Sequence, residues 1–93
     1  MAVKVMIPTP LRQFAGKRES VELEAKTVAE ALNSLTSQFG ELKRHLYSDD
    51  GRLRSFVNVY LNDEDIRYLQ REKTSLQAGD TISIVPSIAG GGD

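Results

Sequence analysis

The chain has 93 residues, enough for one small domain with a single core but too few for a catalytic domain with a deep cleft of its own. Apolar residues make up 40% of it, and 12 basic and 13 acidic residues are spread along its length, so the composition predicts a folded domain without a nucleic-acid-binding surface. The chain contains no cysteine, which excludes disulfides, thiol nucleophiles and thiolate metal ligands.

The N-terminal segment predicts a β-hairpin. Val3, Val5 and Ile7 recur with a period of two, as in a half-buried strand, and prolines at positions 8 and 10 end the run. A second alternating run carries Val21 and Leu23 between charged neighbours. We expect the two runs to pair as antiparallel strands.

A helix is predicted to begin after Thr27. Thr27 as N-cap and Glu30 three residues later form a capping box, which satisfies two backbone N–H groups that the first turn leaves unpaired. The apolar residues that follow at helical spacing form one stripe: Val28, Leu32, Leu35 and Phe39. The stripe predicts a helix that lies across the sheet, and Gly40 is expected to end it in the left-handed conformation.

The segment after this helix predicts a short amphipathic turn over residues 42–46 and then a tight turn. The single histidine, His45, is expected to be a solvated residue on the helical turn, because a zinc site needs several supporting ligands. Asp49 and Asp50 precede Gly51. The two aspartates could be calcium ligands, but the loop lacks the alternating oxygen ligands and distal glutamate of such a site, so a turn is expected.

Residues 56–61 alternate and predict a further strand. Val57, Val59 and Leu61 share one face, and the other face carries Phe56, Asn58 and Tyr60. The acidic residues that follow are expected to form a solvated turn into a short returning strand: Asp63, Glu64 and Asp65.

A last strand is predicted near the C-terminus. Gly79 and Asp80 form a tight turn before it, and Ile82 and Ile84 are expected to face inward. The order strand, strand, helix, strand, short strand, strand predicts an α+β domain of the β-grasp, or ubiquitin-like, fold, in which one main helix packs across a mixed sheet. We expect residues 1–89 to form this domain and residues 90–93 a flexible glycine-rich tail.

Three segments in this order carry a resemblance to a known family: "IPTPLR", "FVNVYLNDEDIR" and "AGDTISIVPSIAGG". With the last strand running into Gly90 and Gly91, the sequence resembles the ubiquitin-like sulfur carriers of the MoaD and ThiS family over almost its whole length. Within that family the three segments are most similar to those of the carrier of cysteine biosynthesis.

The resemblance implies a protein substrate and not an enzyme. An ATP-dependent activating enzyme would convert the C-terminal glycine carboxylate to an acyl-adenylate and then to a thiocarboxylate, which donates sulfur to a synthase. A sulfur nucleophile attacks the acyl carbon once its oxygen is a good leaving group. Gly90 and Gly91 suit a narrow partner channel because they have no Cβ.

Gly92 and Asp93 lie beyond the glycine pair that the resemblance identifies. An aspartate would place a second carboxylate and a Cβ where the activating enzyme needs a bare glycine. We therefore expect a precursor that a zinc-dependent peptidase cuts after Gly91, as in some family members with residues beyond the pair. The alternatives are a cut after Gly92 that removes only Asp93, and no cut at all.

The same alternation predicts a partner-binding surface near the tail. If Val3, Val5 and Ile7 face the helix, Met6 and Val85 face outward together with Ser83, and so do Phe56 and Tyr60. These four apolar or aromatic side chains are candidates for binding a partner: Met6, Phe56, Tyr60 and Val85. Alternatively, they merely cover the sheet, since isolated exposed apolar residues are common.

Two other functions remain open from the sequence. One is the small subunit of molybdopterin synthase, and the other is a ubiquitin-like binding module without tail chemistry. An enzyme is not expected, because no nucleophile with an adjacent base, phosphate-binding loop or metal cluster is present, and ATP would be used by the partner without a cofactor bound here. No apolar run approaches the roughly 20 residues of a membrane span, so we expect a cytoplasmic protein without a membrane partner.

Overall fold

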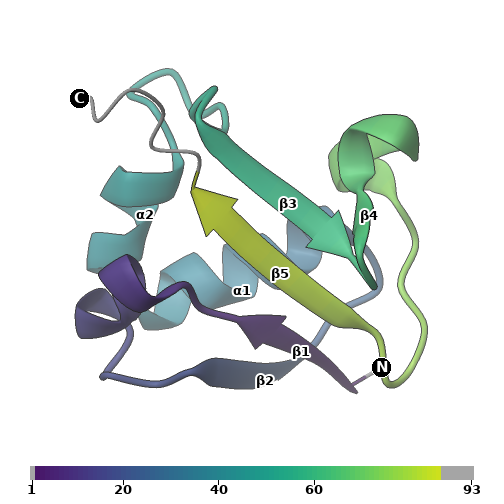
Figure 1. Ribbon diagram of the computed structural model, residues 1–93, viewed down its shortest axis with the longest axis horizontal. Helices are drawn as coiled ribbons and strands as arrows, with labels where there is room; N and C mark the ends of the chain where they lie inside the picture. The colour runs from purple at the N-terminus through teal and green to yellow at the C-terminus, as the bar shows by residue number, and fades with distance from the viewer. Residues whose placement is uncertain (1, 87–93) are drawn as a thin grey trace.

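The computed structural model describes residues 2–86, which form one mixed five-stranded sheet with two α-helices and three short 3₁₀ helices (Figure 1). The strands are β1 (Ala2–Met6), β2 (Ser20–Glu24), β3 (Val57–Leu61), β4 (Glu64–Asp65) and β5 (Thr81–Pro86). The helices are α1 (Val28–Gln38), α2 (Gly40–Leu46), η1 (Thr9–Phe14), η2 (Ile66–Tyr68) and η3 (Arg71–Lys73). The predicted order of strands and main helix is confirmed.

The sheet has the order β2-β1-β5-β3-β4. The predicted hairpin is formed by β1 and β2, which pair antiparallel. β5 lies between β1, with which it is parallel, and β3, with which it is antiparallel. This mixed sheet crossed by one main helix is the predicted β-grasp arrangement, and it places the last strand at the centre of the sheet.

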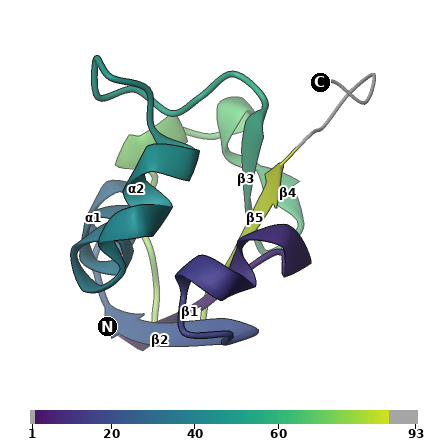
Figure 2. The same ribbon diagram turned by 90° about the vertical axis from the view of Figure 1, so that its left-hand side faces the viewer.

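The core lies between the sheet and the helices α1 and α2, which lie on the same side of the sheet (Figure 2). The inward positions predicted from alternation are buried, among them Val5 and Ile82 with no exposed surface. The stripe of α1 meets them through Leu32 and Leu35, which are also fully buried. At about 25 cal/mol per Å² of apolar surface removed from water, this burial is the main stabilising contribution.

The predicted cap at Thr27 is present, but the reciprocal bond of the capping box goes to Lys26, one residue before the N-cap, and not to Thr27 itself. The Glu30 backbone N–H donates to the Thr27 hydroxyl oxygen over 3.2 Å, and the Lys26 N–H donates to the Glu30 carboxylate over 3.0 Å. Two N–H groups outside the helical hydrogen-bond ladder are thereby satisfied. The helix therefore begins where the sequence predicts.

The prediction for the end of α1 was wrong. Gly40 does not adopt the left-handed conformation but is the first residue of α2, so one helix follows the other after a single residue, Phe39. The Phe39 N–H still bonds to the Leu35 carbonyl oxygen, which completes the last turn of α1. Leu42 and Leu46 then bury against the core, and their burial turns the chain into a second helix.

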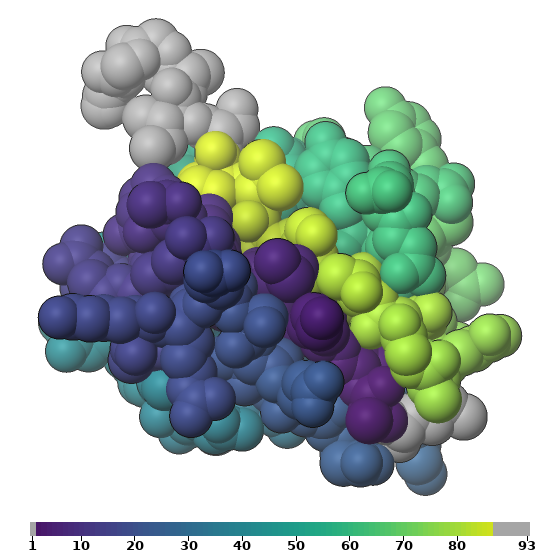
Figure 3. Space-filling view, turned by 60° about the horizontal axis from the view of Figure 1, so that its bottom comes forward, coloured from purple at the N-terminus to yellow at the C-terminus, as the bar shows by residue number. Residues whose placement is uncertain are grey.

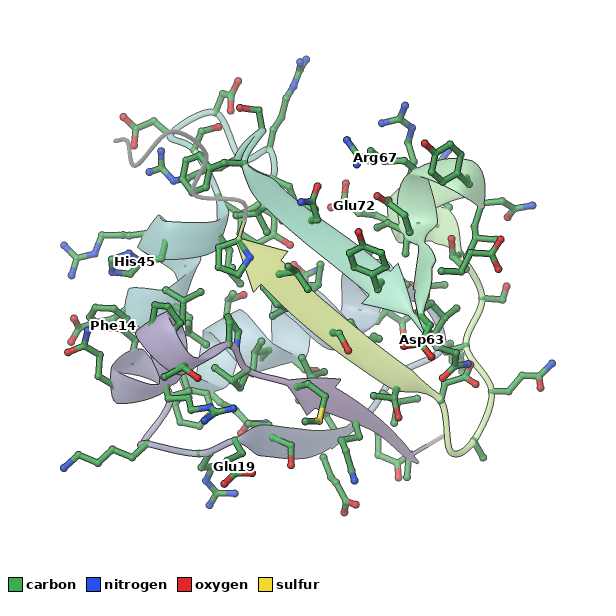
Figure 4. All side chains as sticks on the ribbon, viewed as in Figure 1. Phe14, Glu19, His45, Asp63, Arg67 and Glu72 are labelled. Atoms are coloured by element: carbon green, nitrogen blue, oxygen red, sulfur yellow. The ribbon has the colours of Figure 1, made fainter. Side chains whose placement is uncertain are left out.

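His45 is exposed on α2, as predicted, but it has a neighbour that the sequence did not indicate. Its ring stacks on that of Phe14 in η1, with the ring centres 4.1 Å apart (Figure 4). This contact joins α2 to the segment that follows β1.

We predict that replacing Thr27 with alanine lowers the free energy of unfolding by about 1 kcal/mol, because the Glu30 N–H loses its hydroxyl partner. Urea denaturation followed by circular dichroism measures the change. Thr9→Ala is the matched control, since Thr9 is exposed and its side chain forms no hydrogen bond within residues 2–86. Equal midpoints for the two variants would contradict the role of the cap.

Candidate functional site

The candidate site is built around the end of β5. Pro86, the last described residue, is the register partner of Val57 at the start of β3. The predicted reactive and threading residues, Gly90 and Gly91 with Gly92 as the alternative, lie outside the described residues, as does Asp93. The structure therefore describes the part of the domain from which the tail departs.

The sheet face turned away from α1 carries three of the four predicted partner-binding residues. Met6 and Tyr60 are both register partners of Ser83 and therefore lie in one row across β1, β5 and β3. Val85 lies one row closer to the tail, opposite Asn58, and is 43% exposed. Figure 3 shows β5 at the surface between β1 and β3. The three residues thus share one open face.

Phe56 occupies a different place. It precedes β3, is 46% exposed, and lines a hollow of about 430 Å³ together with Pro86 at the end of β5. The rest of the lining comes from η1, α2 and the segment before β3: Pro10, Leu11, Arg44, His45 and Arg54. The hollow adjoins the base of the tail. No local sequence pattern connects its other residues, because they come from separate segments of the chain.

The prediction of a solvated acidic turn was wrong for Asp65. Its side chain is only 8% exposed, and the Arg67 guanidinium donates to both oxygens of its carboxylate, over 3.2 and 3.1 Å from Nε and 2.7 Å from Nη2. The Arg67 backbone N–H also donates to this carboxylate, over 2.9 Å. These hydrogen bonds hold the pKa of the Asp65 carboxyl below its ordinary value of 3.8. The turn itself is formed by Asn62 and Asp63, both with positive φ.

The described residues offer no metal centre. Within residues 2–86, no three His, Asp or Glu side chains gather where they could hold a metal ion. Burial, with a smaller effect of the Glu72 charge, raises the pKa of Tyr47 to about 12, so this phenol stays protonated at neutral pH. No helix of this part of the chain is long and apolar enough to cross a membrane.

A sequence model of the ThiS family matches residues 5–91. The sulfur carrier protein CysO of Mycobacterium tuberculosis is 37% identical over 93 residues, covering 98% of this chain and all of the relative. Small archaeal modifier protein 3 of Haloferax volcanii is 34% identical over 89 residues, covering 87% of this chain and 96% of the relative.

A solved structure shows the same fold. A chain in the crystal structure of the BexX/CysO complex of Amycolatopsis orientalis superposes with a TM-score of 0.85 and is 39% identical. The match covers 95% of this chain and 98% of the other.

We predict that Asp65→Asn destabilises the domain at neutral pH, because the amide cannot replace the carboxylate in its ion pair with Arg67. A depressed pKa contributes stability that is present above pH 3.8 and lost as the pH falls through the folded-state pKa. The difference between parent and variant should therefore shrink at low pH in urea denaturation. The control is Asp49→Asn, at an exposed position without a positive φ. An Asp65→Asn midpoint equal to that of the parent at pH 7 would refute this role.

Proposed function

Because the chain belongs to the ThiS family of ubiquitin-like sulfur carriers, we propose that its terminal glycine is adenylated and converted to a thiocarboxylate that donates sulfur in biosynthesis. The observation that carries the proposal is the family match over residues 5–91, which includes both glycines of the pair. The chain would be the substrate of its partners and not a catalyst.

The proposed reaction has two steps. An ATP-dependent, E1-like activating enzyme joins the Gly91 carboxylate oxygen to the α-phosphorus of ATP and releases pyrophosphate. A sulfide-class nucleophile then attacks the acyl carbon, the bond to the adenylate oxygen breaks, and AMP leaves. The chain has no cysteine, so its terminus is the place where it could carry sulfur covalently. ATP binds to the partner, and its use there is consistent with a cytoplasmic reaction.

The contribution of this chain is to present its C-terminal tail to the active site of the activating enzyme. β5 is paired on both sides, so the segment that leads into the tail is fixed in the sheet. Gly90 and Gly91 have no Cβ, and a narrow channel of the activating enzyme can therefore close around their backbone. The tail would enter the partner's active site while the domain stays outside.

We propose cysteine biosynthesis as the pathway, with a sulfur-accepting synthase as the second partner. Similarity to the CysO carrier of M. tuberculosis over its whole length supports this choice. The small subunit of molybdopterin synthase is the alternative carrier. Activity of the thiocarboxylated protein with a cysteine-forming synthase, compared with a molybdopterin synthase large subunit, distinguishes the two.

Partner binding is proposed for the open sheet face and the adjoining hollow. Met6, Tyr60 and Val85 form the face, and Phe56 lines the hollow beside Pro86. The BexX/CysO complex supports a docking role, because that structure contains a similar chain assembled with another protein. Apolar side chains beside the tail would let a partner hold the domain while it acts on the terminus.

A second candidate function is protein modification. Small archaeal modifier protein 3 is 34% identical over most of this chain, and its name denotes a modifier. A lysine amine in place of sulfide would attack the same adenylate and give an isopeptide bond. Appearance of lysine-linked conjugates in place of a thiocarboxylate would favour this function.

Which glycine carries the reactive carboxylate can be tested with chains that end at different residues. We propose that residues beyond Gly91 are removed by a zinc-dependent peptidase, and the end of the family match at Gly91 supports this register. A chain ending at Gly91 should undergo ATP–pyrophosphate exchange with its activating enzyme, whereas a chain ending at Asp93 should be inactive until treated with the peptidase.

A chain ending at Gly92 is the matched control for the alternative register. Exchange by the Gly92 form but not the Gly91 form would move the reactive carboxylate to Gly92. Equal exchange by the Asp93 form without pretreatment would refute the precursor.

We further predict that Val85→Asp weakens the apparent affinity for the activating enzyme about tenfold, because it places a charge on the docking face. Folding should be unaffected, since Val85 is 43% exposed. Tyr68→Asp is the control, because Tyr68 is 81% exposed on η2, away from this face. Measuring the concentration dependence of pyrophosphate exchange with chains ending at Gly91 tests both. Unchanged affinity for Val85→Asp would remove this face from the interface.

A further inference from the structure

A second concavity lies at the opposite edge of the sheet from β2. It has a volume of about 500 Å³ and extends along β3 to the 3₁₀ turns after β4. Four arginines from three separate segments line it: Arg52, Arg54, Arg67 and Arg71. No local pattern in the sequence indicates this cluster, because the arginines come from three segments of the chain and the protein as a whole has a net charge of −1.

The concavity has an excess of positive charge. Only two carboxylates, Asp65 and Glu72, are among its lining residues. Asp65 is already bound to Arg67 through the guanidinium hydrogen bonds described above. Arg52 pairs with the exposed Asp50 carboxylate over 4.0 Å, and the Arg54 Nε–H donates to the Arg44 carbonyl oxygen over 3.0 Å, so both keep further N–H donors. Figure 4 shows Arg67 and Glu72 on the segment that follows β4. Guanidinium groups with unused donors recognise carboxylates and phosphates.

Arg71 has a backbone conformation that is unfavourable for its residue type. Its φ is +54°, and the Thr74 hydroxyl holds the turn by donating to the Arg71 carbonyl oxygen over 2.6 Å. The Gln70 N–H donates to the same hydroxyl over 3.0 Å. Within residues 2–86 the Arg71 side chain forms no hydrogen bond or ion pair. Glycine would fit this backbone better, so the Arg71 side chain can be removed by substitution without adding backbone strain.

The concavity also contains an unpaired strand edge. β4 pairs with only the last two residues of β3, Tyr60 and Leu61. Residues 57–59 pair with β5 on one side, and within the described chain no strand pairs with their other side. All three line the concavity. The Val57 N–H is bonded to the Arg54 carbonyl oxygen over 2.9 Å, so the open part of this edge centres on Val59. An edge of this kind can accept an extended peptide as an additional strand.

We propose that an extended acidic segment of a partner protein docks in this concavity, with its backbone along β3 and its carboxylates on Arg71 and the neighbouring arginines. Because Val57 and Pro86 are register partners on neighbouring strands, one end of the concavity lies one strand away from the base of the tail. The partner is therefore one that acts on the tail, and this identification alone rests on the proposed function. An acidic segment fits better than a phosphate ion because the guanidiniums are spread along a strand edge.

The test is a titration of ¹⁵N-labelled protein with a synthetic peptide of alternating glutamate and valine, followed by NMR. The peptide should shift the amide signals of residues 57–59 and of the η3 turn, and added salt should weaken binding. Arg71→Gly should weaken it about fivefold, the loss of roughly one exposed ion pair. Its urea midpoint should not fall, because glycine favours a positive φ.

Lys17→Gly is the matched control. Lys17 is also a cation with a positive φ, +63°, but it precedes β2 at the other edge of the sheet. This variant should bind the peptide within about twofold of the parent. Equal weakening by Arg71→Gly and Lys17→Gly would reduce the effect to net charge and overturn the proposal.

Two further outcomes would overturn the proposed docking of an acidic segment. One is the absence of peptide-induced shifts at residues 57–59. The other is binding of inorganic phosphate at the same residues at lower concentrations than the peptide, which would identify a small-anion site. The titration needs no thiocarboxylate, so a chain that fails to accept sulfur would still bind the peptide, and the two proposals fail separately.

Discussion

The structure depends on the parallel pairing of β5 with β1. This pairing inserts the last strand between the N-terminal hairpin and β3, so that the strand leading to the tail is hydrogen-bonded on both sides. The side chains of Ile82 and Ile84 are buried in the core between this strand and the helices. A strand held in this way gives the following residues a fixed point of departure, and a partner can therefore recognise the domain and the tail together.

The surface around the tail has two regions of different chemistry, an apolar sheet face and a cationic sheet edge. Alternation along β5 sends isoleucines into the core and leaves Ser83 and Val85 on the open face. On the other side of β3, the short β4 leaves part of an edge unpaired beside an arginine-lined groove. An apolar face and a cationic edge thus lie on either side of β3, and a partner that contacts both would be held in one orientation.

Much of the fold follows from local patterns. The period-two runs, the N-cap at Thr27 and the turns at Gly51 and Gly79 each determine local structure, and the structure confirms them. The predictions that were wrong concern residues whose structure depends on packing between distant parts of the chain. Burial of Leu42 and Leu46 makes Gly40 the start of a second helix, and the guanidinium of Arg67 draws Asp65 out of solvent. Of the candidate site, alternation along the strands correctly placed Met6, Tyr60 and Val85 on one face. The hollow beside Phe56 and the arginine-lined concavity could not be predicted, because they join residues that no local pattern connects.

The central claim is that the terminus of this chain receives sulfur. The most direct measurement is the intact mass of the chain ending at Gly91 after incubation with ATP, a sulfide source and its activating enzyme. We expect one carboxylate oxygen to be replaced by sulfur in a reaction that depends on ATP, and fragmentation should locate the change in the C-terminal peptide. An unchanged mass with an enzyme that demonstrably adenylates this chain would contradict this claim.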